Sequence, residues 1–255
     1  MKQVVKAMQW ALVLLGLAGV TTADAAEIKV LSAGAVRAII TDLAQAFEQQ
    51  TGNKVTLAFG TVGVTRKRLA EEAADVVIMT DVAIDEASAQ GAVVAGSRAD
   101  IARTGMGVGI REGAPKPDIS TPEAFKQALL AAKSITYVDP AQGATSGIHF
   151  AGVLKSLGIA EAMQPRTTLV PGGYPAELVA EGKVEMVVHQ ISEIVPVKGV
   201  TLVGPLPKAV QKITTYSVGV AKKAEAPEVA RAFVAFLISP ATKAKLAAAG
   251  LDYKE

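Results

Sequence analysis

Short apolar runs alternate along the chain with longer segments in which apolar residues recur every three or four positions. Residues 28–31 and 55–59 are runs of the first kind, and residues 36–47 form a segment of the second kind that Gly52 ends. The short runs predict buried strands, and the longer segments predict amphipathic helices. This order occurs three times up to residue 91, so we predict an α/β fold with a mainly parallel sheet flanked by helices.

The third repeat has a predicted strand at residues 76–79 and a helix that Asp81 is positioned to cap. The alternation then starts again. Further strands are predicted at residues 101–110, 135–138, 168–170, 185–189 and 213–220, and further helices after Thr121-Pro122, at residues 146–157 and 176–181, and twice near the C-terminus, the last from Ser239-Pro240. Gly105, Gly107 and Gly109 indicate close backbone packing at a hinge.

Two successive sets of strand–helix units, followed by a return segment, predict two lobes with a ligand cleft between them. We expect the chain to cross between the lobes near residues 104–111 and 212–220. Lobe 1 would then consist of residues 26–104 plus 218–255, and lobe 2 of residues 105–217. A single continuous doubly wound domain is the alternative.

The N-terminus has the pattern of a secretory signal peptide. Lys2 and Lys6 precede an apolar run at residues 7–20, and Ala23-Asp24-Ala25 has the small-x-small pattern of a cleavage site. We therefore expect residues 1–25 to be removed on export to a periplasm, with an uncleaved anchor helix as the alternative. The apolar run is short for a membrane span, and we expect no membrane insertion of the mature chain.

Composition excludes several kinds of site. The chain has no Cys, so it has no disulfide, thiolate metal site or Cys nucleophile. Its formal net charge is +2, and loss of the signal peptide removes two positive charges and one negative charge. A nearly neutral chain with few aromatic residues is a poor candidate for nucleic acid. Nucleotide-loop, zinc-helix and nucleophile-elbow motifs are absent, and we expect no metal and no cofactor.

Four predicted strand-to-helix turns are rich in small and hydroxyl residues, at residues 32–35, 60–63, 143–147 and 171–174. Turns of this kind expose backbone N–H groups and the positive end of the helix dipole at the carboxyl edge of a sheet. They predict an anion clamp with two turns in each lobe. The ligand-binding candidates are Ser32, Gly34, Ala35, Thr61, Val62, Gly63, Thr145, Ser146, Gly173 and Tyr174.

Charged and polar candidates lie close to the same edges. Arg37 and the run Arg66-Lys67-Arg68 fall in first helical turns, where the dipole disfavours cations, so Arg66 or Arg68 is a candidate partner for an anion and a solvated helix face is the alternative. His149 and His189 are the only histidines, and Gln190, Ser192 and Glu193 follow His189. Each histidine is either a structural residue or a ligand contact. Glu193 is either a general base or a residue that caps a helix or forms a salt bridge.

Residues 30–34, 59–63, 74–81, 138–140, 181–185 and 232–246 resemble the molybdate-binding branch of the periplasmic substrate-binding proteins. The similarity covers essentially the whole mature chain. It implies a class II two-lobed receptor, usually a monomer, with its ligand in the cleft between the lobes.

The oxyanion site of that branch is only partly matched. Two binding serines of the branch align with Ala35 and Val62, and a binding tyrosine aligns with Gln190. A site built on hydrogen bonds suffers when its donors disappear, so we expect a ligand other than molybdate. Residues 94–98, 113–120 and 190–194 resemble an organic-acid subgroup that includes aconitate isomerase.

Two functions follow from this resemblance. The first is a periplasmic binding protein whose lobes close on a small polycarboxylate anion, a tricarboxylate such as aconitate, and which passes it to an ABC-type permease. The second is a cofactor-independent isomerase that interconverts cis- and trans-aconitate by an allylic proton shift. For the isomerase, His149 is the first candidate base, and His189 and Glu193 are the others.

Overall fold

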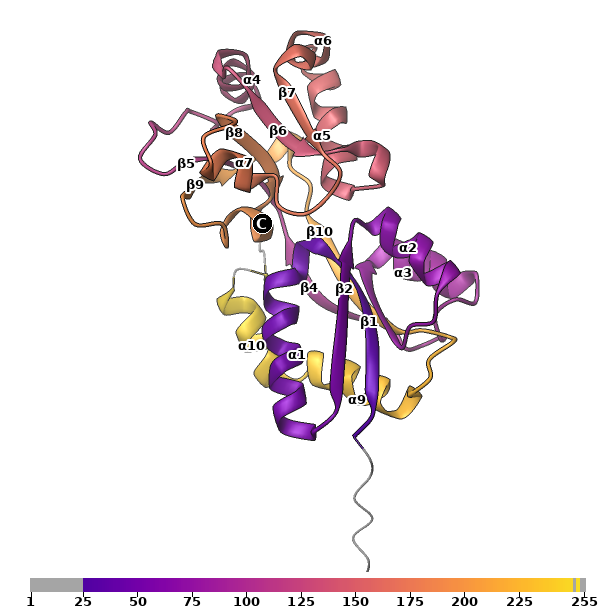
Figure 1. Ribbon diagram of the computed structural model, residues 1–255. Helices are drawn as coiled ribbons and strands as arrows, with labels where there is room; N and C mark the ends of the chain where they lie inside the picture. The colour runs from indigo at the N-terminus through magenta and orange to yellow at the C-terminus, as the bar shows by residue number, and fades with distance from the viewer. Residues whose placement is uncertain (1–24, 250, 253–255) are drawn as a thin grey trace, which may run out of the picture.

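The computed structural model describes residues 25–249 and 251–252. The predicted signal peptide therefore lies outside the described residues, apart from Ala25. Two five-stranded sheets, each flanked by helices, form two lobes (Figure 1). The α/β fold predicted from the sequence is confirmed, and the alternative of one continuous sheet is wrong.

The first lobe contains the sheet β2-β1-β3-β10-β4. Its strands are β1 (Glu27–Ala33), β2 (Lys54–Gly60), β3 (Val76–Thr80), β4 (Ala99–Thr104) and β10 (Thr214–Val220). Its helices are α1 (Arg37–Thr51), α2 (Val62–Glu71), α3 (Asp81–Ala89), α9 (Pro227–Leu237) and α10 (Pro240–Ala248), and a short 3-10 helix, η1 (Gly34–Val36), precedes α1. Strands β1, β2 and β3 are parallel, whereas β10 runs antiparallel to both β3 and β4.

The second lobe contains the sheet β7-β6-β8-β5-β9. Its strands are β5 (Met106–Arg111), β6 (Ile135–Val138), β7 (Thr167–Val170), β8 (Met186–Gln190) and β9 (Val200–Pro205). Its helices are α4 (Pro122–Ala131), α5 (Thr145–Ser156), α6 (Ala160–Met163), α7 (Ala176–Ala180) and α8 (Ile191–Ile194), with 3-10 turns at η2 (Pro140–Gln142), η3 (Gln164–Arg166) and η4 (Lys208–Val210). Strand β5 is the antiparallel member here.

Each lobe has its own aromatic core. In the first lobe Phe47 of α1 packs edge-on against Phe233 of α9, with ring centroids 5.1 Å apart. In the second lobe Tyr137 of β6 packs edge-on against Phe150 of α5 at 4.9 Å. Gly52 ends α1 with a φ of 76°, a conformation that costs glycine little. These cores hold the ends of the parallel strands in fixed positions.

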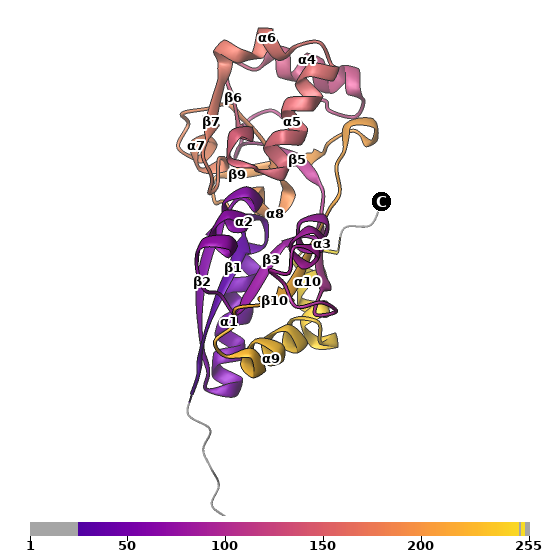
Figure 2. The same ribbon diagram turned by 90° about the vertical axis from the view of Figure 1, so that its right-hand side faces the viewer.

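The chain crosses between the lobes twice, at Gly105 and again between β9 and β10 (Figures 1 and 2). The extended segment predicted at residues 101–110 is therefore two strands in two different sheets. Strand β10 lies wholly in the first sheet, so the lobe boundary expected between residues 217 and 218 falls inside this strand.

Three details correct or extend the predicted elements. Thr80, not Asp81, caps α3, because its hydroxyl accepts a hydrogen bond from the Ala83 N–H. Strand β9 has no counterpart among the predicted strands. A Cβ added at Gly107 would lie 2.8 Å from the Gly204 carbonyl oxygen, which explains the absence of a side chain at that position.

Within the described part of the chain, no helix has the length and apolar content needed to cross a membrane.

Candidate active site in the interlobe cleft

A cavity of about 360 Å³ lies between the two lobes, where the carboxyl ends of β1, β2, β6 and β8 meet. The first lobe contributes Ala33, Gly34, Ala35, Arg37, Phe59, Gly60, Thr61, Val62, Val64 and Tyr216, and the second contributes Val138, Ala144, Thr145, Ser146, Pro171, Gly172, Gly173, His189 and Glu193. Ligands of open α/β sheets bind at this edge. Among these lining residues, Arg37 is the cation, Glu193 the carboxylate and His189 the imidazole.

His189 is held from both sides at the end of β8. It is only 2% exposed, and its Nδ1 lies 3.1 Å from the Oγ of Ser146 in the first turn of α5. Its Nε2 lies 3.3 Å from Oε2 of Glu193. An ionised carboxylate only accepts hydrogen bonds, so we assign the ring proton to Nε2 and let the Ser146 hydroxyl donate to Nδ1.

Nε2 of His189 nevertheless has no hydrogen-bond partner among the described residues, because the N–H and the Glu193 carboxylate are not aligned for one. Buried polar atoms without a partner are rare in folded proteins and often occur at functional sites. His189 itself lines the cavity, so its imidazole lies beside any molecule bound there.

Glu193 reaches the cleft from α8, one helical turn after His189. It is 6% exposed, and a Cβ added at Gly34 in the first lobe would lie only 3.1 Å from its Oε1 atom. The lack of a side chain at Gly34 therefore leaves room for a carboxylate from the opposite lobe. No salt bridge to an arginine or lysine neutralises this carboxylate in the part of the chain that the structure describes.

Arg37, the first residue of α1, lies between aromatic rings of the two lobes. Its guanidinium carbon is 4.7 Å from the ring centroid of Phe59 and 5.6 Å from that of Tyr174. Burial and the negative charge of Glu193 raise the pKa of Tyr174, and the Arg37 charge opposes this shift. Arg37 has no salt bridge to a described carboxylate, so its charge is available to an anion in the cleft.

The first turn of α5 is a second site for negative charge. Its N-cap residue, Ala144, has no side chain that can cap the helix, and Thr145 and Ser146 line the cavity. The α2 turn is different, because Thr61 caps that helix by accepting from the Val64 N–H. The first turn of α5 therefore has N–H groups without a side-chain cap, unlike the first turn of α2.

Two residues of the α2 turn join the lobes. The Thr61 hydroxyl donates to the Gln142 carbonyl oxygen, and the Gly63 N–H donates to the Gly143 carbonyl oxygen at 3.1 Å. A Cβ added at Gly63 would lie 2.8 Å from Cα of Gly143. The lobes thus touch directly on one side of the cavity.

The cavity brings together some of the sequence candidates and leaves others outside. Those that line it are Gly34, Ala35, Thr61, Val62, Thr145, Ser146, Gly173, His189 and Glu193. Tyr174 lies at its edge over Arg37. Outside it lie Ser32, Gly63, Arg66, Arg68, His149, Gln190 and Ser192.

Several of the excluded candidates have other partners, whereas Oγ of Ser192 has none among the described residues. Arg66 pairs with Glu86 at 2.6 Å, and Arg68 pairs with Glu72. Nε2 of His149 lies 2.9 Å from the Val210 carbonyl oxygen. The Ser32 hydroxyl donates to the Ala33 carbonyl oxygen.

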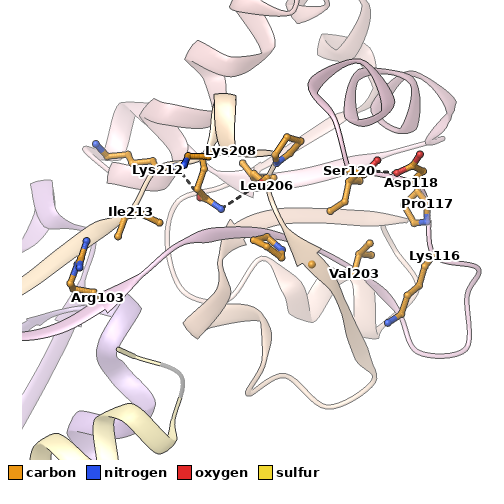
Figure 3. A pocket seen from close by; sticks show the side chains of 15 residues that line it. Arg103, Lys116, Pro117, Asp118, Ser120, Val203, Leu206, Lys208, Lys212 and Ile213 are labelled. Carbon is orange, nitrogen blue, oxygen red and sulfur yellow. Dashed lines mark hydrogen bonds between the residues drawn. The ribbon is translucent and has the colours of Figure 1, made fainter. Parts of the chain in front are cut away.

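Tyr216 also lines the cavity and was not among the sequence candidates. It belongs to β10, which returns to the first sheet from the far end of the chain, and no motif marks it. A larger hollow, of about 1040 Å³, lies beside the crossings, and Figure 3 shows the side chains that line it. Its cations, which include Arg103, Lys116 and Lys212, point in different directions, and it contains no histidine. The interlobe cavity is therefore the candidate site. No group of three potential metal ligands occurs among the described residues.

Comparisons with known proteins agree with this geometry. The family model described as bacterial extracellular solute-binding protein matches residues 28–252. An aconitate isomerase from Pseudomonas sp. is 36% identical over 219 residues, which are 83% of this chain and 82% of the relative. Among solved structures, the periplasmic molybdate-binding protein of Azotobacter vinelandii is similar with a TM-score of 0.73 and 20% identity, over 89% of this chain and all of that one. AfuA from Actinobacillus pleuropneumoniae, with fructose-6-phosphate bound, has a TM-score of 0.67 and 16% identity, over 89% of this chain and 83% of that one.

Proposed function

The chain belongs to the bacterial extracellular solute-binding protein family, and we propose that it is a periplasmic isomerase of aconitate or a closely related unsaturated tricarboxylate. The observation behind this proposal is the buried pair of His189 and Glu193 in the cleft, with the Nε2 and Oε2 atoms 3.3 Å apart. A protein that only binds an anion needs no buried carboxylate facing it. The similarity to a Pseudomonas aconitate isomerase over most of both chains supports the same reaction.

Binding uses the positive groups of the cavity. Arg37 offers a guanidinium to one ligand carboxylate, and the open first turn of α5 offers N–H groups to another. The two groups come from different lobes, so one small polycarboxylate can contact both. The negative charge of this ligand would neutralise the guanidinium of Arg37, which has no salt bridge to a described carboxylate.

The reaction moves one proton and one double bond. Glu193 takes a proton from the methylene carbon, and the electron pair of that C–H bond shifts into the conjugated system as a dienolate. The protonated Glu193 then returns the proton to the other end of the allylic system, so no oxidant, water or cofactor is consumed. The imidazole of His189, oriented by Ser146, packs beside the Glu193 carboxylate and limits its movement in the cleft.

A direct test is to incubate the purified protein with trans-aconitate and to follow cis-aconitate by chromatography. We expect catalytic turnover in the wild type and its loss in Glu193→Gln, which keeps the size of the side chain and removes its basicity. No turnover in the wild type at any pH would contradict the proposal.

A transport receptor for the same anions, coupled to an ABC-type permease, is the second candidate. The observation that favours it is the direct contact between Gly63 and Gly143, which brings the lobes together beside the cavity. A receptor would be stabilised against heat by aconitate without converting it. The isomerase would show both stabilisation and conversion.

A further inference from the structure

Tyr216 lies in the cleft but has no part in the binding and proton transfer described above. It comes from β10 of the first lobe, is only 2% exposed and lines the cavity. Buried tyrosines usually satisfy the hydroxyl while the ring packs against apolar groups. The hydrogen bonds of the Tyr216 hydroxyl show whether it can still donate a hydrogen bond to a ligand.

Gln190 of β8 contacts Tyr216 from the other lobe. Its Nε2 lies 3.4 Å from the Tyr216 hydroxyl oxygen and 3.2 Å from the Thr214 Oγ1 atom, and it donates to both. The Tyr216 oxygen therefore accepts, and its own O–H hydrogen remains free to donate. Among the described residues, none accepts a hydrogen bond from that O–H.

The surroundings of Tyr216 keep the phenol protonated. Burial raises its pKa well above the ordinary value, and the negative charge of Glu193 raises it further, while the hydrogen bond from Gln190 acts in the opposite direction. A phenol of this kind is a hydrogen-bond donor at any pH at which the protein would work.

We propose that the Tyr216 hydroxyl donates a hydrogen bond to a carboxylate oxygen of the bound ligand, and that Gln190 positions it for this role. The inference rests on the proposed isomerase function and adds a catalytic residue to it. When Glu193 removes the methylene proton, negative charge moves through the conjugated system onto a carboxylate oxygen. A donor already aimed at that oxygen stabilises the dienolate, and the Tyr216 proton itself is not transferred.

A matched pair of variants tests the role of Tyr216. Tyr216→Phe and Thr214→Val each remove one hydroxyl that accepts from Gln190, but of the two residues only Tyr216 lines the cavity. We expect Tyr216→Phe to lower kcat for aconitate isomerisation about 100-fold, as loss of one oxyanion donor does elsewhere. Thr214→Val is expected to change kcat less than about threefold. Circular dichroism and melting temperature check that both variants fold.

Binding of tricarballylate, a saturated tricarboxylate that cannot isomerise, separates this inference from the proposed function. We expect calorimetry to show a several-fold loss of affinity in Tyr216→Phe and none in Thr214→Val. If the wild type binds tricarballylate but never converts aconitate, the isomerase proposal fails, and the weaker binding of Tyr216→Phe still supports the contact. Equal affinity and turnover in Tyr216→Phe and the wild type would overturn the inference, as would equal losses in both variants or no binding of tricarballylate by the wild type.

Discussion

Nε2 of His189 lies 3.3 Å from Oε2 of Glu193, and both side chains are more than nine-tenths buried at the floor of the interlobe cleft. His189 is the last residue but one of β8, and Glu193 follows in the single turn of α8. The pair therefore depends only on a local strand-to-helix turn. Ser146 of α5 then fixes the ring from the opposite side. This arrangement allows a test that separates the two histidines of the chain.

His189→Gln is expected to lower kcat for aconitate isomerisation by about 100-fold, because a misplacement of about 1 Å in a catalytic group such as Glu193 can cost that much. The variant removes the imidazole that faces Glu193. His149→Gln is the matched control, because Nε2 of His149 contacts the Val210 carbonyl oxygen outside the cavity. It should retain nearly full turnover in the same chromatographic assay. A larger loss in the His149 variant than in the His189 variant would contradict the assignment.

Arg37→Gln is expected to weaken binding of tricarballylate by about 10- to 100-fold in calorimetry, because a hydrogen bond between two charged groups contributes about 1.5–3 kcal/mol. Arg37→Lys should restore only part of the affinity, since an ammonium cannot form the same planar, paired contact. Arg66→Gln is the control, because this arginine pairs with Glu86 with its side chain 47% exposed. Unchanged affinity in Arg37→Gln would exclude it as the cation that binds the ligand.

The sequence predicted the two lobes and some of the residues that line the cleft. The candidate residues that lie outside the cleft do so for physical reasons. The failure at Arg68 could have been avoided, because Arg68 lies in the last turn of α2 and Glu72, its C-cap residue, is four residues further on, a spacing that indicates an ion pair. Glu86, the partner of Arg66, lies on α3, and no local pattern connects the two residues.

His149 and Gln190 are two further candidates that lie outside the cavity. The position of His149 along its helix and the direction of the Gln190 side chain on its strand explain why. His149 lies almost one turn deeper in α5 than Ser146, so it misses the cleft that the first turn of the helix faces. Gln190 follows His189 in β8, and successive side chains of a strand point in opposite directions. It therefore contacts Thr214 and Tyr216 instead of lining the cavity. Tyr216 itself joins the site only through tertiary structure.

Gly63→Ala is expected to weaken ligand binding without lowering the melting temperature. The added methyl group would lie 2.8 Å from the Gln142 carbonyl oxygen and from Cα of Gly143, so it would push the lobes apart. Alanine is otherwise favoured over glycine in a helix by about 1 kcal/mol. Gly152→Ala is the control, because nothing lies within 4 Å of a Cβ at that helical position. Equal affinities in the two variants would show that this contact has no part in closure.

Glu72 is expected to contribute stability that depends on pH. Hydrogen bonds from Arg68 and Lys29 lower its pKa from the ordinary value of 4.5 to about 2. Above pH 4.5 the carboxylate is ionised in both the folded and the unfolded chain, so its stabilisation is complete there and is lost as the pH falls toward 2. The difference in melting temperature between the wild type and Glu72→Gln should therefore be constant above about pH 5 and shrink toward pH 2.

The control for Glu72 is Glu71→Gln. The Glu71 carboxylate lies 3.9 Å from Lys67, and both side chains are largely exposed. This variant should differ little from the wild type at any pH. A difference between the wild type and Glu72→Gln that does not vary with pH would contradict the role given to Glu72.

The most direct test of the central claim is proton NMR of trans-aconitate mixed with the wild-type protein, with Glu193→Gln measured in parallel. We predict that the signals of cis-aconitate grow with time in the wild-type sample and that their rate is lowered at least about 100-fold in the variant. A wild-type spectrum that stays unchanged while aconitate raises the melting temperature would contradict catalysis and support a transport receptor.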